Sequence, residues 1–386
     1  MSNKQIIPLF KVFMSQDVIE PLNNVLMSGY ITQGTKVEEF ENILKKYFDN
    51  DKILSLNSAT SGLTLAIRLL KKAKDNWPGL NDDDEILSSP LTCTATNWPI
   101  LANNLKIKWV DVDVKNCNIN IDDLRNKLSY KTKVIMVTHW GGYPVDLDKL
   151  KEIQEYCLIN FGFKPIIIED CAHAFGAEYK DKKLGNHGNI CIFSLQAIKH
   201  LTSGDGGLIV LPNQELYDRA KLLRWYGIDR DTRNYKGKDF RLESDVKEWG
   251  YKFHMNDINA TIGLYNFIHL EKNLSLHRNN AKFFNENLIN VKDVELLNYE
   301  IDRISSYWIY TMKVKRKNEF MDHMKKNGIV VSQVHNRNDI HSCVEDFKTY
   351  LVNLDNLEKE MICIPVGWWI NKEQMEFIVN TIKVGW

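Results

Sequence analysis

The sequence lacks the features that mark nucleic-acid-binding, membrane or disulfide-rich proteins. Its 50 basic and 50 acidic residues cancel to a formal net charge of zero, which argues against nucleic acid or a membrane surface as a partner. No apolar run approaches the length of a membrane span. The seven cysteines are odd in number and show no CxxC spacing. We therefore expect no disulfide framework and no metal site.

Other common signals are absent as well. The chain has no internal repeat and no low-complexity linker, and its first dozen residues, MSNKQIIPLFKV, are too mixed for a secretory signal. We expect a cytoplasmic protein. With 386 residues and 44% hydrophobic content, the chain can bury a large core, as one large and one smaller domain.

The most informative stretch is 190–211, which reads ICIFSLQAIKHLTSGDGGLIVL. Its two apolar runs, 190–193 and 208–211, predict buried strands. Between them, a polar loop carries Lys199 and the glycine-rich run 204–207. A lysine that such strands shield from water can lose its proton and attack a carbonyl group. Taken alone, a solvated loop lysine is the commoner outcome.

A second stretch, 166–173, supplies the context. It reads IIIEDCAH, an apolar run that ends in acids, as a buried parallel strand does when its carboxyl end reaches a site. A lysine for a Schiff base and a buried aspartate for a pyridinium nitrogen are the pair that pyridoxal phosphate requires. Three motifs stand in order along the chain: Asp170-x-Ala172-His173, Phe193-Ser194 with Lys199 five residues after the serine, and Gly204-Asp205-Gly206-Gly207. With these motifs the chain resembles the pyridoxal-phosphate sugar aminotransferases of the DegT–DnrJ–StrS type.

The resemblance implies an α/β fold of the fold-type I aminotransferase kind. A large cofactor-binding domain over 1–265 would hold a mostly parallel, seven-stranded sheet covered by helices, and 266–386 would form a smaller C-terminal α/β domain. The alternation of apolar strands such as 109–112 and 134–137 with helices independently favours a parallel, helix-covered sheet. In the smaller domain we expect short strands at 307–314, 329–334 and 361–364.

The resemblance also implies which residues bind pyridoxal 5′-phosphate. Lys199 would form the Schiff base and Asp170 would hold the ring nitrogen, and these two are the predicted catalytic residues. The turn 57–62 joins a predicted strand to a helix, whose N-terminus can hold a phosphate. The predicted cofactor contacts are Ala59, Thr60, Cys93, Asp170, His173, Ser194, Lys199 and Lys252.

Two of these positions depart from the family pattern. Relatives generally place a large aromatic residue at the position of Cys93, stacked on the cofactor ring, and a thiol loses roughly 0.5–1.5 kcal/mol of that stacking. Either Cys93 packs there or nearby Trp98 substitutes. Many relatives carry asparagine at the position of Lys252 and use it on the phosphate of the neighbouring subunit. The resemblance thus implies a homodimer with shared active sites.

The substrate contacts implied by the resemblance lie on three polar segments. These are the glycine-bracketed turn 29–34, the basic segment 230–241 and the turn 334–339. The basic segment could clamp a diphosphate, although its composition alone equally suits a solvated loop. The predicted substrate-binding residues are Tyr30, Thr32, Arg230, His335 and Arg337.

The implied reaction moves an amino group, with L-glutamate as the donor, onto a keto-deoxysugar linked to a nucleotide diphosphate, for amino-sugar or polysaccharide biosynthesis. Two alternatives stay open. Related dehydratases carry histidine in place of the Schiff-base lysine, and His200 directly follows Lys199, but the spacing from Ser194 favours the lysine. A cofactor-binding regulator without turnover is the other alternative, and the zero net charge makes it weaker.

Overall fold

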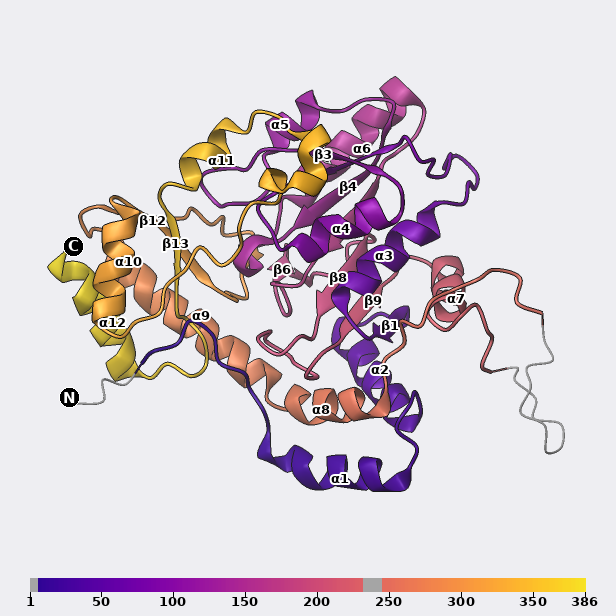
Figure 1. The fold of residues 1–386 in the computed structure, drawn as a ribbon, viewed down its shortest axis with the longest axis horizontal. Helices are drawn as coiled ribbons and strands as arrows, with labels where there is room; N and C mark the ends of the chain where they lie inside the picture. Colours follow the sequence, from indigo (N-terminus) through magenta and orange to yellow (C-terminus); the bar gives the residue numbers. More distant parts are fainter. Residues whose placement is uncertain (1–5, 232–244) are drawn as a thin grey trace.

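A seven-stranded sheet forms the centre of the protein (Figure 1). The computed structural model describes residues 6–231 and 245–386. The strand order is β1-β9-β8-β5-β4-β2-β3. In that order, the strands comprise Ile53–Leu56, Gly207–Val210, Ile190–Ser194, Ile166–Asp170, Thr132–Thr138, Glu85–Ser88 and Lys106–Trp109. Only β9 runs against its neighbours, pairing antiparallel with both β1 and β8. The predicted mostly parallel sheet is confirmed.

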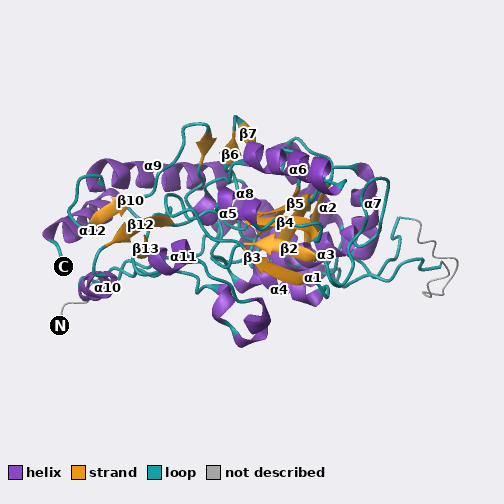
Figure 2. Ribbon diagram, turned by 90° about the horizontal axis from the view of Figure 1, so that it is seen from above, coloured by secondary structure: helices purple, strands orange, loops and turns teal. Residues whose placement is uncertain are grey.

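The sheet is buried on both faces because its strands are apolar on both sides. Successive residues point to opposite faces, so Ile167 and Ile168 of β5 enter two different apolar clusters. Helices α3, α4 and α7 cover one face, and α2, α5, α6 and α8 cover the other. Figure 2 shows this layered arrangement edge-on. These helices comprise Ala59–Leu70 (α3), Thr94–Ala102 (α4), Gln214–Leu223 (α7), Thr35–Phe48 (α2), Ile121–Asn126 (α5), Leu147–Phe161 (α6) and Asp257–Phe267 (α8).

The C-terminal part is a smaller α/β unit. Strands β10 (Val294–Leu296), β12 (Tyr310–Val314) and β13 (Met361–Ile364) form an antiparallel sheet that packs with α9 (Leu270–Leu288), α10 (Lys317–Lys326) and α12 (Lys372–Val384). Helix α9 runs between the two parts (Figure 1), because Leu274 belongs to the large core and Phe284 to the small one. The boundary at 265/266 stays a prediction.

The remaining elements are short. Helix α1 (Ile19–Ser28) lies at the periphery of the molecule (Figure 1), and α11 (Val352–Leu357) packs on the large core. A third small sheet has the order β11-β6-β7, with bounds Arg303–Ile304, Glu178–Tyr179 and Lys182–Lys183. In the described part of the chain, no helix combines the length and apolar character needed to cross a membrane.

Two predicted strands differ from the structure. The segment 329–334 forms only isolated bridges, Ile329 to Ile7 and Ser332 to Cys363. Its extended course ends at Val334, which has a φ of 72°, a left-handed conformation that no strand continues. The prediction of a strand there is wrong. The strand expected at 109–112 lies earlier, at Lys106–Trp109.

Candidate active site

A cavity of about 480 Å³ opens at the carboxyl ends of β4, β5 and β8. Such an edge is where α/β sheets bind ligands. The small unit closes the cavity through Trp308 and His335. Seven of the eight predicted cofactor contacts line it, namely Ala59, Thr60, Cys93, Asp170, His173, Ser194 and Lys199.

Lys199 reaches the cavity from a loop that folds back on the end of β8. The Leu195 N–H donates to the Gly206 carbonyl at 2.9 Å, which closes this loop. The Lys199 amine lies 3.5 Å from the ring centroid of Trp308, and the Trp308 indole N–H donates to the Ile198 carbonyl at 2.9 Å. Trp308 therefore holds both the side chain and the backbone of this loop.

Loss of hydration inside the cavity lowers the pKa of Lys199 to about 7, although the negative charge of Asp170 opposes that shift. A lysine with this pKa is substantially a free amine at neutral pH, which is the form that attacks a carbonyl group. Its position and its lowered pKa suit Lys199 to the predicted role of nucleophile.

Asp170 ends strand β5 and is buried in the floor of the cavity. The Thr96 hydroxyl donates to its Oδ2 at 2.6 Å, and the Ala172 N–H donates to its Oδ1 at 3.0 Å. Burial raises the pKa of Asp170 above its ordinary value, and these two hydrogen bonds oppose that shift. The carboxylate is thus fixed in direction and can pair with a cation in the cavity.

Two neutral histidines lie beside the lysine. His173 stacks on Trp308 with 4.0 Å between ring centroids, and its Nε2 lies 3.3 Å from the Nε2 of His335. Burial holds the pKa of His173 well below its usual range and lowers that of His335 to about 4. The Nδ1 of His173 is buried without a hydrogen-bond partner among the described residues. This nitrogen thus has unused hydrogen-bonding capacity.

The start of helix α3 also lines the cavity, where its N–H groups could form a cradle for an anion. Ser58 caps this helix and accepts from the Ser61 N–H at 3.1 Å, while the first N–H groups of a helix have no partner within it. Gly207, paired with Ser194 across the sheet, lies so close that a Cβ would stand 2.5 Å from the Ala59 nitrogen. The cradle, the unpaired His173 nitrogen and the Lys199–Asp170 pair fit pyridoxal phosphate.

The alternatives at Cys93 and at the lysine are separated by position. Cys93 lines the cavity, whereas Trp98 packs into an apolar cluster and meets His341 edge-on at 5.7 Å. His200 does not line the cavity either, and its Nε2 is bonded to the Ser306 carbonyl at 3.0 Å. Of the two neighbouring residues Lys199 and His200, only Lys199 lines the cavity.

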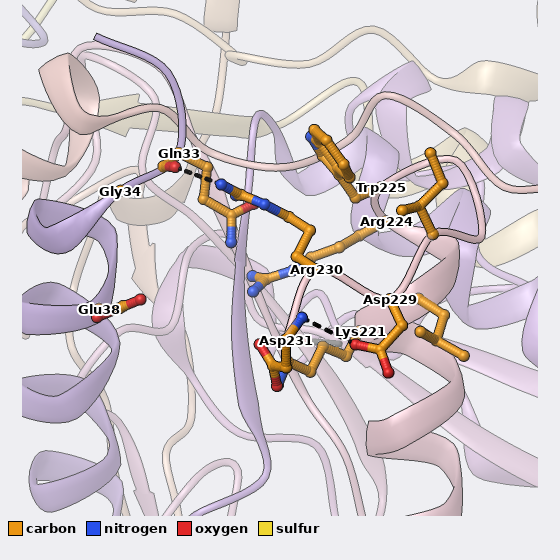
Figure 3. Close-up of a pocket in the computed structure, with 11 residues that line it drawn as sticks. Gln33, Gly34, Glu38, Lys221, Arg224, Trp225, Asp229, Arg230 and Asp231 are labelled. Atoms are coloured by element: carbon orange, nitrogen blue, oxygen red, sulfur yellow. Dashed lines mark hydrogen bonds and ion pairs between the residues drawn. The ribbon is translucent and has the colours of Figure 1, made fainter. Parts of the chain in front are cut away.

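Most other predicted substrate residues lie outside this cavity. Tyr30, Thr32 and Arg230 line a separate cavity of about 770 Å³ near α1. Arg230 also borders a small cavity of about 150 Å³ (Figure 3), where it donates to the Gln33 carbonyl at 2.9 Å. The basic positions 233, 236, 238 and 241 lie outside the described residues. Lys252 is exposed, and its carbonyl accepts from the Asn57 amide at 3.2 Å.

Arg337 is placed differently from the prediction. Its guanidinium forms a bidentate ion pair with Asp339, with both distances 2.7 Å, and also pairs with Asp355 of α11. It is buried and does not line the cavity. Arg337 thus anchors the turn that presents His335, and a direct substrate contact finds no support.

Sequence reasoning missed Trp308, Thr96 and Thr138, which line the cavity. Trp308 comes from the small unit, and no local pattern ties it to Lys199. The two threonines stand on a helix and on a strand end that are far apart in sequence, so only the folded sheet brings them to Asp170.

A free lysine amine and a buried aspartate at the carboxyl edge of a fold-type I sheet define a pyridoxal-phosphate-dependent enzyme. The comparisons identify the family within that class. A model of the DegT/DnrJ/EryC1/StrS aminotransferase family matches residues 13–383. The chain belongs to this family, and it is an aminotransferase whose cofactor is pyridoxal phosphate.

Individual relatives agree with this placement. The crystal structure of AtS13 from Actinomadura melliaura is 46% identical with a TM-score of 0.93, and the match covers 100% of both chains. The sugar aminotransferase CalS13 from Micromonospora echinospora is 42% identical with a TM-score of 0.93, over 99% of this chain and 100% of that one. The UDP-4-amino-4-deoxy-L-arabinose–oxoglutarate aminotransferase of Shewanella sediminis is 32% identical over 68% of this chain and 64% of its own length.

Proposed function

We propose that the protein transfers an amino group from L-glutamate to a keto-deoxysugar linked to a nucleotide diphosphate, in the synthesis of an amino sugar for a polysaccharide or another glycan. The observation that carries the proposal is the Lys199 amine in the cavity beside the buried Asp170 carboxylate. The sugar acceptor is supported by the similarity to a named sugar aminotransferase over 99% of the chain.

The two proposed catalytic residues have different roles: Asp170 supplies a negative charge, and Lys199 transfers a proton. Bound pyridoxal phosphate supplies an electron sink for the carbon that loses its proton. Asp170 keeps the ring nitrogen protonated, because a carboxylate in contact favours the cation. Lys199 holds the cofactor covalently. When not bonded to the cofactor, its Nζ would accept and return the proton of the donor's alpha carbon.

Neighbouring residues orient the cofactor and the acceptor. The N–H groups at Ala59 and Thr60 and the Ser194 hydroxyl lie where they can hold the phosphate. His173 offers its unpaired Nδ1 to the phenolic oxygen of the ring. His335 faces the same space from the small unit and, being neutral, can contact an uncharged sugar hydroxyl.

We also propose a cytoplasmic homodimer that shares its active sites. Apolar side chains on and beside α1 are exposed, with Ile19 at 65%, Met27 at 76% and Tyr30 at 83%, as expected of a surface that a second copy covers. All seven cysteines are unpaired, which suits a reducing compartment. In this arrangement Lys252 reaches the partner's phosphate, and Tyr30, Thr32 and Arg230 complete the partner's substrate site.

The test follows the two halves of the reaction. L-glutamate alone should convert the bound cofactor to its amine form, with loss of the yellow colour. A panel of nucleotide-linked keto sugars should then regenerate the yellow form and yield an amino sugar detectable by mass spectrometry. Lys199→Ala should do neither. Conversion by glutamate without turnover of any keto sugar would refute the proposed acceptor class, and failure with all amino donors would refute the transfer itself.

A further inference from the structure

A chain of three buried threonine hydroxyls ends on the Asp170 carboxylate. Thr138 donates to Thr92 over 3.3 Å between their Oγ1 atoms. The Oγ1 atoms of Thr92 and Thr96 are 2.7 Å apart, and Thr96 donates to Asp170 Oδ2 at 2.6 Å. The exposed fractions of the three threonines are 7%, 1% and 1% in that order. Water therefore does not compete with these bonds.

Three elements of the large unit build this chain. Thr92 and Thr96 flank the start of α4, four residues apart, with Cys93 as the N-cap between them. Thr138 is the last residue of β4 and lies opposite Asp170, the last residue of β5, in the parallel register. These hydrogen bonds thus connect the ends of β4 and β5 to the start of α4.

The Asp170 carboxylate determines which hydroxyl donates to which in this chain of hydrogen bonds. An ionised carboxylate only accepts, and a hydroxyl has a single proton to give. The Thr96 hydroxyl donates its proton to Asp170. Thr92 must therefore donate to Thr96, and Thr138 must donate to Thr92. All three O–H dipoles then point toward the carboxylate, and such aligned bonds strengthen one another away from water.

We propose that Thr96, supported by Thr92 and Thr138, is a positioning residue that keeps Asp170 ionised and aims it at the cofactor ring nitrogen. The inference rests on the proposed contact between Asp170 and that nitrogen. Burial alone favours a protonated carboxyl group, which could not hold a pyridinium proton. The hydroxyl chain offsets that penalty and leaves the remaining lone pairs of Asp170 for the ring.

The test measures binding of pyridoxamine phosphate to the cofactor-free protein. This form carries an amine, so it makes no covalent bond to Lys199, and its affinity reports the noncovalent contacts alone. Thr96→Val keeps the shape and removes the hydroxyl. We expect it to weaken binding about tenfold or more, since a hydrogen bond to a charged group contributes that much or more. Thr96→Ser retains the hydroxyl and should stay within about threefold of wild type.

A double-mutant cycle separates positioning from packing. Asp170→Asn should itself weaken binding, and adding Thr96→Val to it should change the affinity by less than about twofold, because the charge that Thr96 serves is gone. Equal losses in both backgrounds, or a Thr96→Val affinity within twofold of wild type, would overturn the proposal. No sugar or amino donor is used, so failure of the proposed transfer would not affect this result.

Thermal melts check that each variant is folded. If Thr96→Val does not fold, Thr92→Val carries the test, because it removes the second donor without touching Asp170. A loss of affinity for pyridoxamine phosphate of about threefold or more in Thr92→Val, absent when Asp170→Asn is also present, supports the proposed role of the threonine hydroxyls. Unchanged affinity in a folded Thr92→Val protein overturns it. An Asp170→Asn protein that binds as wild type does would overturn the ring-nitrogen contact as well.

Discussion

At the scale of single residues, the site depends on two ionisable groups, the buried Asp170 and the partly buried Lys199. The Lys199 amine lies against the face of Trp308, and the Asp170 carboxylate accepts two hydrogen bonds. Burial shifts the pKa of the lysine down and that of the aspartate up. The shift of the lysine favours the free amine, while the two hydrogen bonds to Asp170 oppose the upward shift that burial causes.

The lowered pKa of Lys199 predicts how the stability of the cofactor-free protein depends on pH. In the folded state the pKa is about 7, and in the unfolded chain it is near the ordinary value of about 10.4. Between these values the unfolded state binds more protons, so the free energy of unfolding rises with pH across that window. Burial of the Lys199 amine lowers the free energy of unfolding by its full amount below about pH 7 and has no effect on it above about pH 10.

Thermal melts from pH 6 to pH 10 check this prediction, with Lys199→Met as the matched variant that fills similar space without a charge. The difference in melting temperature between the variant and wild type should be largest near pH 6 and shrink toward pH 10. A difference that stays constant over the range would mean that the Lys199 amine is hydrated in the folded protein.

At the scale of elements, the active site depends on how closely β9 approaches the start of α3. Gly207→Ala would place a Cβ 2.5 Å from the Ala59 nitrogen and from the Ser58 carbonyl carbon. Backbone atoms cannot yield cheaply, so the helix start would have to move. We expect a lower melting temperature and at least a tenfold loss of cofactor affinity, which corresponds to about 1.4 kcal/mol or more.

Gly188→Ala is the control for this substitution. Gly188 has a φ of 83°, and no atom lies within 4 Å of the point where its Cβ would stand, so alanine there costs backbone strain of about 1 kcal/mol without a clash. Its cofactor affinity should equal that of wild type. If Gly207→Ala also bound the cofactor normally, the α3 start would not be the phosphate cradle.

Sequence patterns locate the strands but not the side chains that meet across them. The strand predicted before the turn 57–62 is confirmed as Ile53–Leu56, and the strand predicted at 361–364 is confirmed as well, because short apolar runs between turns have few alternatives. The segment 329–334 also begins with apolar residues, but Val334 takes a left-handed conformation with a φ of 72°. The local sequence pattern does not predict this conformation of Val334.

The same limit applies to the candidate site. Lys199, Asp170 and the turn at Ala59 can be found from the sequence because the family motifs are contiguous. Trp308 cannot, because it comes from the small unit and meets Lys199 only after the two parts pack. The charge of Arg337 suggests a substrate contact, but Asp339 and Asp355 neutralise that charge in the fold.

At the scale of the whole molecule, one chain does not bring all the predicted site residues together. Lys252, Tyr30, Thr32 and Arg230 lie outside the cavity that holds Lys199, and the α1 surface is apolar and exposed. In the proposed two-fold dimer each of these residues would occupy two equivalent positions, and we propose that they complete the partner's cavity there.

Subunit mixing tests this arrangement. Lys199→Ala and Lys252→Ala homodimers should each be inactive or weak. After unfolding and refolding of an equal mixture, half the dimers are mixed, and each has one doubly damaged and one intact site, so roughly a quarter of all sites should recover. A thermal melt must show that the Lys252→Ala parent is folded. No recovery from two folded parents would place Lys252 in its own subunit's site or outside it.

The central claim is that Lys199 carries the cofactor, and chemical trapping tests it most directly. Borohydride reduction of the yellow protein fixes pyridoxal phosphate on the lysine that holds it, and peptide mapping by mass spectrometry identifies that lysine. We predict one labelled peptide, with the label on Lys199, and no label in Lys199→Ala. A label on Lys183 or Lys221 instead, or a wild-type protein that takes up no label, would contradict the account.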